Sequence, residues 1–301
     1  MAMNRAVFAS QLEPGLNALF GLEYRQYPEQ WREIFEANTS VKAFEEDVLL
    51  EGFGEAAVKP EGGSVTFDTA AELWTARYNH DTVALAFSLT EEAEEDGLYG
   101  SLGKRYVKAL ARSMAHTKEI TASNVLNNGF DSSYTGGDGL ELLSTAHVTA
   151  NGTQSNELTT AADLNETSLE QLLINISNAV DDRGIPAAMM GEALILPTAL
   201  QFVATRLLES TLRTATAEND INAIRSGGYL PQGFKVNQRL TDSDAWFIRT
   251  DCPDGMKMFQ RRAIKKGLEG DFETGNIRYK TSERYSFGWT NWRGMYGSPG
   301  A

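Results

Sequence analysis

Residues 103–129, GKRYVKALARSMAHTKEITASNVLNNG, decide the fold because they predict one unusually long helix. Asn127, Asn128 and Gly129 form a stop signal at its C-terminal end. At 1.5 Å per residue, a helix over residues 103–128 is about 39 Å long and must pack against other elements along its length. Apolar side chains step by three or four along and just before this stretch, which is helical spacing: Tyr99, Leu102, Tyr106, Leu110 and Met114, roughly continued by Ile120 and Leu126.

Upstream of this helix, residues 44–87 predict a long β-hairpin. Ser64–Asp68 alternates with a period of two, and Leu73–Phe87 alternates in part. Glycines and the Lys59–Pro60 pair between these stretches predict a flexible tip. A two-stranded ribbon is marginally stable alone in water, so its side chains need a further surface, in the same subunit or in another.

The first 37 residues are rich in aromatic side chains and poor in local regularity. Only Pro28–Ala37 predicts a short helix. Two interpretations stay open. The rings pack on their own domain, as most aromatics do, or they form an arm laid across a neighbouring subunit, where Tyr and Trp are good anchors. The rings are Phe8, Phe20, Tyr24, Tyr27, Trp31 and Phe35.

Downstream of the helix the pattern becomes that of an α+β unit. After a loop-rich stretch with a hairpin-turn signal at Asn151-Gly152, Thr167–Glu170 predicts a capping box that opens a helix. Two apolar strands are predicted at Ala193–Leu196 and Ala245–Ile248, and Pro197 opens another helix between them. The final stretch, residues 272–297, is aromatic and strand-like.

Composition excludes several classes of protein. The chain has 301 residues and one cysteine, Cys252, which excludes an internal disulfide and cysteine-based metal sites. It has neither a membrane-length apolar run nor a secretory signal. A net charge of −14 argues against broad attachment to nucleic acid.

The charge is unevenly distributed along the chain. Residues 251–301 hold 9 basic and 6 acidic residues, a net of +3, which leaves −17 for residues 1–250. This asymmetry fits a solvated acidic surface, attraction between different copies, or an acidic wall that lets packed DNA slide past; the sequence does not rank the last two.

The search for catalytic chemistry yields no site. Gly100–Arg105 resembles part of a phosphate loop, but the glycine spacing is wrong and Arg105 replaces the required Ser or Thr. The histidines, His80, His116 and His147, lie on unrelated predicted elements and are expected to be structural. The sequence therefore predicts no catalytic, metal-binding or cofactor-binding residue.

The order arm, ribbon, long helix, α+β unit and aromatic strand tail resembles the Hong Kong 97-type fold of tailed-phage major capsid proteins. Local strings strengthen the resemblance after the helix, and the C-terminal strings are similar to the ending of the Mu-like major head subunit group. The strings are Asn124–Gly129, Gly137-Asp138-Gly139, Leu143–His147, Asn151–Asn156, Tyr285–Trp289, Arg293-Gly294 and Tyr296–Ser298.

The resemblance implies an α+β capsid fold divided into four parts. Residues 1–43 would form the N-terminal arm, and 44–87 the extended loop. Residues 88–159 and about 261–295 would form a peripheral domain, with the spine helix inside 90–128. Residues 160–260 would form the axial domain, which meets its copies at five-fold and six-fold axes.

The implied function is self-assembly into an icosahedral shell around phage double-stranded DNA, in the host bacterial cytoplasm and without a cofactor or a membrane. Hexamers and pentamers of the chain, portal and scaffolding proteins, and decoration proteins would be its partners. No fused scaffolding segment is expected, because the sequence starts directly at the arm. The candidate interface residues are Tyr24, Tyr27, Trp31, Phe35, Lys59, Gly62 and Gly63, with Lys59 also the candidate for a covalent cross-link.

Two alternatives remain open from the sequence. One is an encapsulin-like shell around a cargo enzyme, which would share the fold. The other is a cytosolic enzyme whose site the motifs do not reveal.

Overall fold

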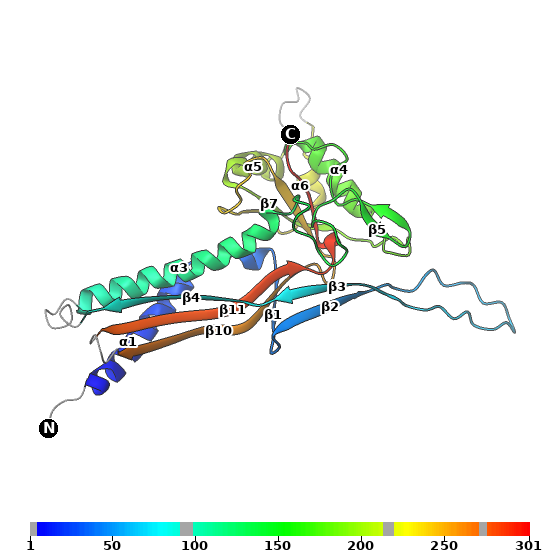
Figure 1. Ribbon diagram of the computed structural model, residues 1–301. Helices are drawn as coiled ribbons and strands as arrows, with labels where there is room; N and C mark the ends of the chain where they lie inside the picture. Colours follow the sequence, from blue (N-terminus) through cyan, green and yellow to red (C-terminus); the bar gives the residue numbers. More distant parts are fainter. Residues whose placement is uncertain (1–4, 91–98, 213–219, 271–275) are drawn as a thin grey trace.

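The computed structural model describes residues 5–90, 99–212, 220–270 and 276–301, and side chains within the helices from residues 14 and 103 onward. Figure 1 shows an elongated molecule in which a domain holding the C-terminus rises from one end of a long layer, while a ribbon projects from that layer. The predicted long helix is confirmed as α3 (Tyr99–Asn127), 29 residues long.

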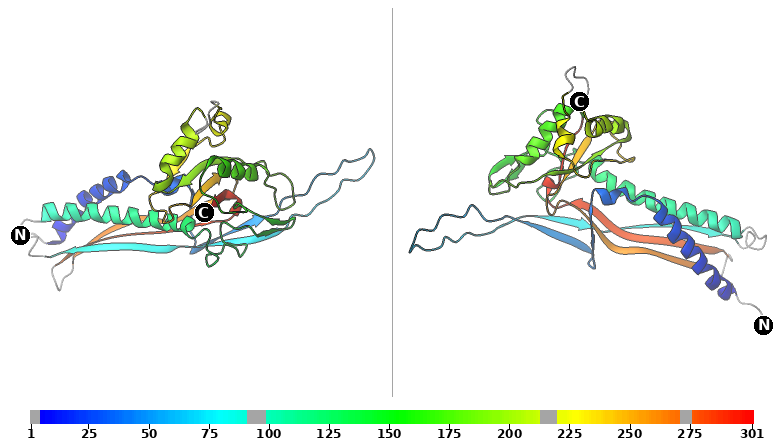
Figure 2. Two further views of the ribbon diagram at one scale, coloured as in Figure 1. Left: turned by 90° about the horizontal axis from the view of Figure 1, so that it is seen from above. Right: turned by 180° about the vertical axis from the view of Figure 1, so that it is seen from behind.

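The long layer is built around a β-hairpin from the C-terminal part of the chain. Strands β10 (Met256–Gly270) and β11 (Ile277–Trp289) pair antiparallel. β4 (Asp81–Leu89) joins β11 antiparallel, and β1 (Glu36–Thr39) joins β10 in parallel. Helices α3 and α1 (Arg5–Gln26) cover one face of this four-stranded sheet (Figure 2). We call this unit the peripheral layer.

The buried face of α3 differs from the expected one. Tyr106 and Ile120 are exposed, although they were expected to face inward with Leu110 and Met114. The true inward face runs through smaller residues, because the helix lies close to the sheet and to α1. Its members are Val107, Leu110, Ala111, Met114, Lys118, Ala122 and Leu126.

The second domain has its own sheet and core. Strand order is β12-β9-β7-β8, formed by Met295–Ser298, Trp246–Thr250, Gly191–Leu196 and Phe234–Val236. Helices α4 (Glu166–Ser177), α5 (Gln201–Glu209) and α6 (Ala223–Gly227) pack around it, with η2 (Thr198–Leu200) before α5. The predicted strands and the helix after Pro197 are confirmed. We call this unit the axial domain.

Two strands bear on the expected range 160–260 of the axial domain. β10 begins at Met256, inside the expected range 160–260, because Met256–Gln260 already pair with β11. β12 at the chain end belongs to the axial sheet, since it pairs with β9. The capping box of α4 is made by Asn165 and Ser168, two residues before the expected start.

The ribbon is shorter in regular structure than expected. β2 (Phe44–Leu50) and β3 (Glu72–Asn79) pair antiparallel, but residues 51–71 form an extended loop without strand pairing, so the predicted strand at Ser64–Asp68 is wrong. The ribbon also ends at Asn79 and not at Phe87, because β4 pairs with β11. The Asn151-Gly152 turn is confirmed between β5 (His147–Thr149) and β6 (Gly152–Gln154).

The N-terminal arm is more regular than its sequence indicated. Residues 5–26 form α1 despite Pro14, and Leu16 and Phe20 of this helix are buried against α3 and the sheet. Tertiary packing of one helix face outweighs the local cost of proline and glycine. The predicted helix at 28–37 is only the 3₁₀ turn η1 (Gln30–Glu33), followed by β1.

We expect Trp31→Ala to lower the free energy of unfolding of the subunit by about 3–5 kcal/mol, the range for emptying a buried aromatic site. Trp31 is 2% exposed and packs edge-on against Phe287, with ring centroids 5.8 Å apart. Urea unfolding of the isolated subunit measures the loss. Tyr134→Ala, at an exposed ring, is the matched control and should change stability by less than about 1 kcal/mol.

Candidate assembly surfaces

The structure divides the four aromatic interface candidates of the arm into two pairs. Trp31 and Phe35 lie in the subunit's own core, 2% and 3% exposed, where both contact Phe287. Tyr24 and Tyr27 are partly exposed beside α3. Burial next to Glu283 raises the pKa of the Tyr24 phenol. Only Tyr24 and Tyr27 therefore keep accessible surface for a neighbouring subunit.

The three candidates of the ribbon lie together at the tip of the extended loop. Lys59, Gly62 and Gly63 flank a turn closed by a hydrogen bond from the Gly63 N–H to the Pro60 carbonyl, 3.0 Å long. Gly62 has φ +77°, which favours glycine, and a Cβ on Gly63 would lie 2.9 Å from Pro60 Cγ. The two glycines are therefore required by the turn itself.

The extended loop exposes large apolar side chains that the subunit leaves in water. Val58 and Phe67 are each 95% exposed, and Phe53 and Val65 are 63% and 62% exposed. The same loop is acidic: residues 51–71 carry four carboxylates and one lysine. An exposed apolar surface with a charged rim is typical of a binding surface.

The sheet face opposite the helices is strongly basic. Strand alternation and the register of β10, β11 and β4 place five cationic side chains and one carboxylate, Glu269 opposite Arg278, on this face. Ala84, Ala86 and Gly267 lie among them, so the surface carries little bulk. In the part of the chain that the structure describes, no helix covers it (Figure 1). We call it the basic face: Arg262, Lys265, Arg278, Lys280 and Arg284.

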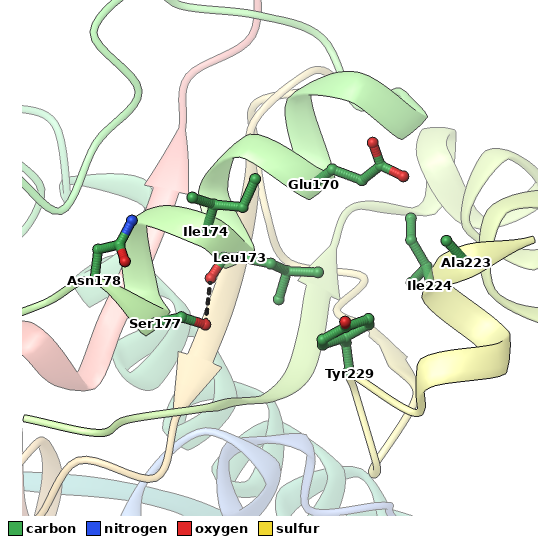
Figure 3. A pocket seen from close by; sticks show the side chains of 8 residues that line it. All are labelled: Glu170, Leu173, Ile174, Ser177, Asn178, Ala223, Ile224 and Tyr229. Atoms are coloured by element: carbon green, nitrogen blue, oxygen red, sulfur yellow. Dashed lines mark hydrogen bonds between the residues drawn. The ribbon is translucent and has the colours of Figure 1, made fainter.

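An apolar groove lies in the axial domain between α4 and the turn around α6. It measures about 390 Å³. Figure 3 shows Leu173 and Glu170 directed from α4 toward Ile224 and Tyr229 on the opposite side, with Ser177 donating to the Leu173 carbonyl. Ile174 and Tyr229 are more than half exposed at its rim. The groove has the character of a contact surface and holds no cluster of chemically reactive groups.

Buried charged side chains of α3 contact both β11 and the arm. Lys118 and Glu283 form a buried ion pair with Nζ and Oε2 3.5 Å apart, and Lys118 also lies 5.2 Å from the ring centres of Trp31 and Tyr285. Burial raises the pKa of Glu283 despite this lysine. The next residue, Glu119, accepts a hydrogen bond from the Trp31 backbone N–H at 3.1 Å.

Two of the three histidines have structural partners. His147 is buried, stacked on Trp292 and within 2.7 Å of an Asp138 oxygen, and His80 lies between Ser40 and Ser286. Burial raises the pKa of the Cys252 thiol to about 12. Within residues 5–90, 99–212, 220–270 and 276–301, no group of acidic, His or Cys side chains is arranged to hold a metal, and no helix has the length and apolarity to cross a bilayer.

Sequence reasoning missed the basic face and the axial groove. Arg278, Lys280 and Arg284 all occupy even-numbered positions of one predicted strand. This alternation could have revealed the basic face, because alternate strand residues share a face. The groove arises from two helices about 50 residues apart, and no local pattern announces it.

Comparison with solved structures shows the same fold in shell-forming proteins. The virus-like particle from Pyrococcus furiosus matches with a TM-score of 0.56 and 11% identity over 95% of this chain and 98% of that one. The capsid of Myoviridae phage XM1 matches with a TM-score of 0.51 and 13% identity, over 88% and 90%. Microbacterium phage Oxtober96 matches with a TM-score of 0.51 and 8% identity, over 90% and 91%. No curated protein sequence matches the chain.

The fold is thus the Hong Kong 97-type fold of shell proteins. A family model described as phage capsid protein matches residues 74–298, most of the chain. The chain belongs to the phage capsid protein family and is a structural major capsid protein of the virion, which assembles as many copies into a shell.

We expect the folded subunit to lose stability as pH rises to about 7, because burial raises the pKa of Glu119 to about 7. The folded state therefore favours the neutral acid, and this stability is complete below the unfolded value near 4.5 and lost as pH rises to about 7. Unfolding free energies measured from pH 5 to 8 should fall for the parent and stay flatter for Glu119→Gln. Equal slopes would contradict the assignment.

Proposed function

We propose that this capsid protein forms hexamers and pentamers that close into an icosahedral shell around the phage's double-stranded DNA. Repetition of one contact set around symmetry axes turns weak pairwise contacts into a stable shell. The axial domain, with its exposed apolar groove, meets its copies at the axes. The DNA is enclosed without sequence-specific binding, in keeping with the net charge of −14.

The extended loop is the observation that carries this proposal. It projects from the subunit, exposes Phe53, Val58 and Phe67, and lacks strand pairing of its own. Its surplus of carboxylates complements the basic face of the peripheral layer. The loop of one copy therefore lies on a neighbouring copy, with Lys59, Gly62 and Gly63 at its far end and Tyr24 and Tyr27 adding arm contacts. Complementary charge selects the partner surface and the register.

Further partners follow from the same role. Portal and scaffolding proteins take part in assembly in the host bacterial cytoplasm, and decoration proteins bind the finished shell. Catalysis has no part in this function. A covalent cross-link through Lys59 would need an activating carboxylate and a partner residue on another copy.

A cargo-enclosing nanocompartment is the second candidate function. It would share the fold, whereas the family match to phage capsid protein favours the phage shell.

Electron microscopy of the purified protein and of particles from infected cells tests the proposal. Shells, hexamers or pentamers, with double-stranded DNA in the particles, are the expected result. A co-purified protein cargo without DNA or portal would overturn the phage shell in favour of the nanocompartment. A stable monomer or dimer at high concentration with a bound metabolite would overturn both.

We expect deletion of Lys59–Ser64 to block shell formation while the subunit stays folded, because these residues form only the tip turn and contribute nothing to the three hydrophobic cores. Circular dichroism reports folding, and microscopy reports assembly. Normal shells from the shortened chain would show that the tip is not an element between subunits.

We expect the double reversal Lys265→Glu with Lys280→Glu to reduce assembly at least about tenfold, since it places like charges opposite the acidic loop. Light scattering at low salt follows assembly. Lys104→Glu with Arg105→Glu on exposed positions of α3 is the matched control, with the same change in net charge. Adding Glu55→Lys and Glu61→Lys to the first variant should restore assembly. Unchanged assembly of the first variant would remove the basic face from the interface.

A further inference from the structure

Arg183 of the axial domain reaches across to the root of the extended loop. Its Nη2 donates to the Thr69 carbonyl at 2.7 Å, and its Nε lies 3.1 Å from Oε1 of Glu51 as an ion-pair contact. A carboxylate oxygen of Asp68 is 3.8 Å from the same Nη2. One guanidinium therefore touches both strands of the loop where they leave the paired ribbon.

The backbone that carries Arg183 is held in a tight turn. The Asp181 carboxylate accepts hydrogen bonds from the N–H groups of Arg183 and Ile185, at 2.9 and 2.8 Å. Gly184 has φ +86°, and a Cβ there would lie 2.6 Å from Asn151 Nδ2, so the β5–β6 turn closes around it. The Arg183 side chain thus extends from a fixed base.

Asp182 fixes the same turn to the core. Its Oδ1 lies 3.0 Å from Nη2 of Arg293, and both side chains are almost fully buried. Any movement of the turn would separate a buried ion pair, which is costly because it leaves an unpaired charge.

Hydrogen bonds hold the root of the loop on both sides of the contact with Arg183. The Glu51 N–H donates to the Ala71 carbonyl at 2.8 Å, and the Gly54 N–H donates to Asp68 Oδ2 at 2.7 Å. The hydrogen bonds from the Gly54 and Thr69 N–H groups lower the pKa of Asp68, so it stays charged beside Arg183. Among the described residues, the next hydrogen bond along the loop is the one at its tip, from Gly63 to Pro60.

We infer that Arg183 is a positioning residue that sets the direction in which the extended loop leaves the subunit. This inference rests on the proposed function, in which the loop lies between subunits. It identifies the contact that holds the loop in position before a neighbouring subunit binds. The arginine contacts the loop where strand pairing has ended, so a small change at the root becomes a large displacement at Val58. A loop held in one conformation loses less conformational entropy on binding than a loop that samples many conformations.

The pose of the loop can be measured without assembly. Spin labels on Val58→Cys and Val148→Cys, in a Cys252→Ser background, give the loop-to-axial-domain distance by pulsed electron paramagnetic resonance. Both labelled side chains are exposed, and the full-length subunits are kept too dilute to assemble. Thermal unfolding checks that each variant folds.

A narrow distance distribution is expected with Arg183 and a broad one with Arg183→Gln. Arg183→Lys should be intermediate, because it keeps the charge but loses the fork that reaches both Glu51 and Thr69. Hydrogen exchange at the Gly54 amide should become about tenfold faster in Arg183→Gln. Arg206→Gln, on the exposed side of α5, is the matched control and should match the parent in both measurements.

An unchanged distribution in Arg183→Gln, or equal broadening in Arg206→Gln, would overturn the role of Arg183. Assembly is read separately by microscopy. A broad distribution in Arg183→Gln together with a normal yield of shells would support the role of Arg183. It would count against the loop as an assembly element.

Discussion

The fold depends on covering one face of α3 along its whole length. That face enters two different cores: Val107 to Met114 pack with α1 and the long strands, whereas Ala122 and Leu126 pack with residues of the axial sheet. Neither neighbouring segment in sequence can supply so long a cover. The β10–β11 hairpin, more than 120 residues downstream, supplies it, so the peripheral layer is complete only when the chain's C-terminal part has returned. The axial domain is consequently an insertion between the helix and its cover.

Charges on this buried face act on alignment more than on stability. A buried ion pair such as Lys118–Glu283 is weak evidence for net stabilisation, because desolvation offsets the attraction. A slip of α3 by one turn against β11 would, however, leave both charges buried without partners. Glu119 similarly accepts the Trp31 N–H only when η1 lies at one place along the helix. Polar contacts therefore fix the register that apolar packing alone leaves loose.

Elements governed by local patterns could be predicted from the sequence, and those governed by tertiary contacts could not. The C-terminal end of α3, the Asn151-Gly152 turn and the strand at Ala193–Leu196 follow from spacing and turn chemistry, and all are present. Helix α3 begins at Tyr99, four residues before the predicted start. Helix α1 was not predicted because Pro14 and Gly15 lower its helix propensity. The helix is stabilised by the packing of Leu16 and Phe20 against α3, which the local sequence does not show. Ser64–Asp68 has the alternation of a strand without a partner to pair with. Of the interface candidates, aromatic composition could not separate Trp31, which completes a core, from Tyr27, which stays partly exposed.

This last distinction explains where assembly surfaces can lie in such a subunit. Residues that complete the cores already make their contacts within the subunit. Replacing them lowers the stability of the fold before it affects assembly. The extended loop is the opposite case, since its apolar side chains contribute to none of the three hydrophobic cores and its backbone makes few internal hydrogen bonds. Its carboxylates and the basic face lie on the same chain yet at opposite ends of an elongated molecule (Figure 1). Such separated, complementary charges favour contact between copies over contact within one, and repeated contact of that kind builds a shell.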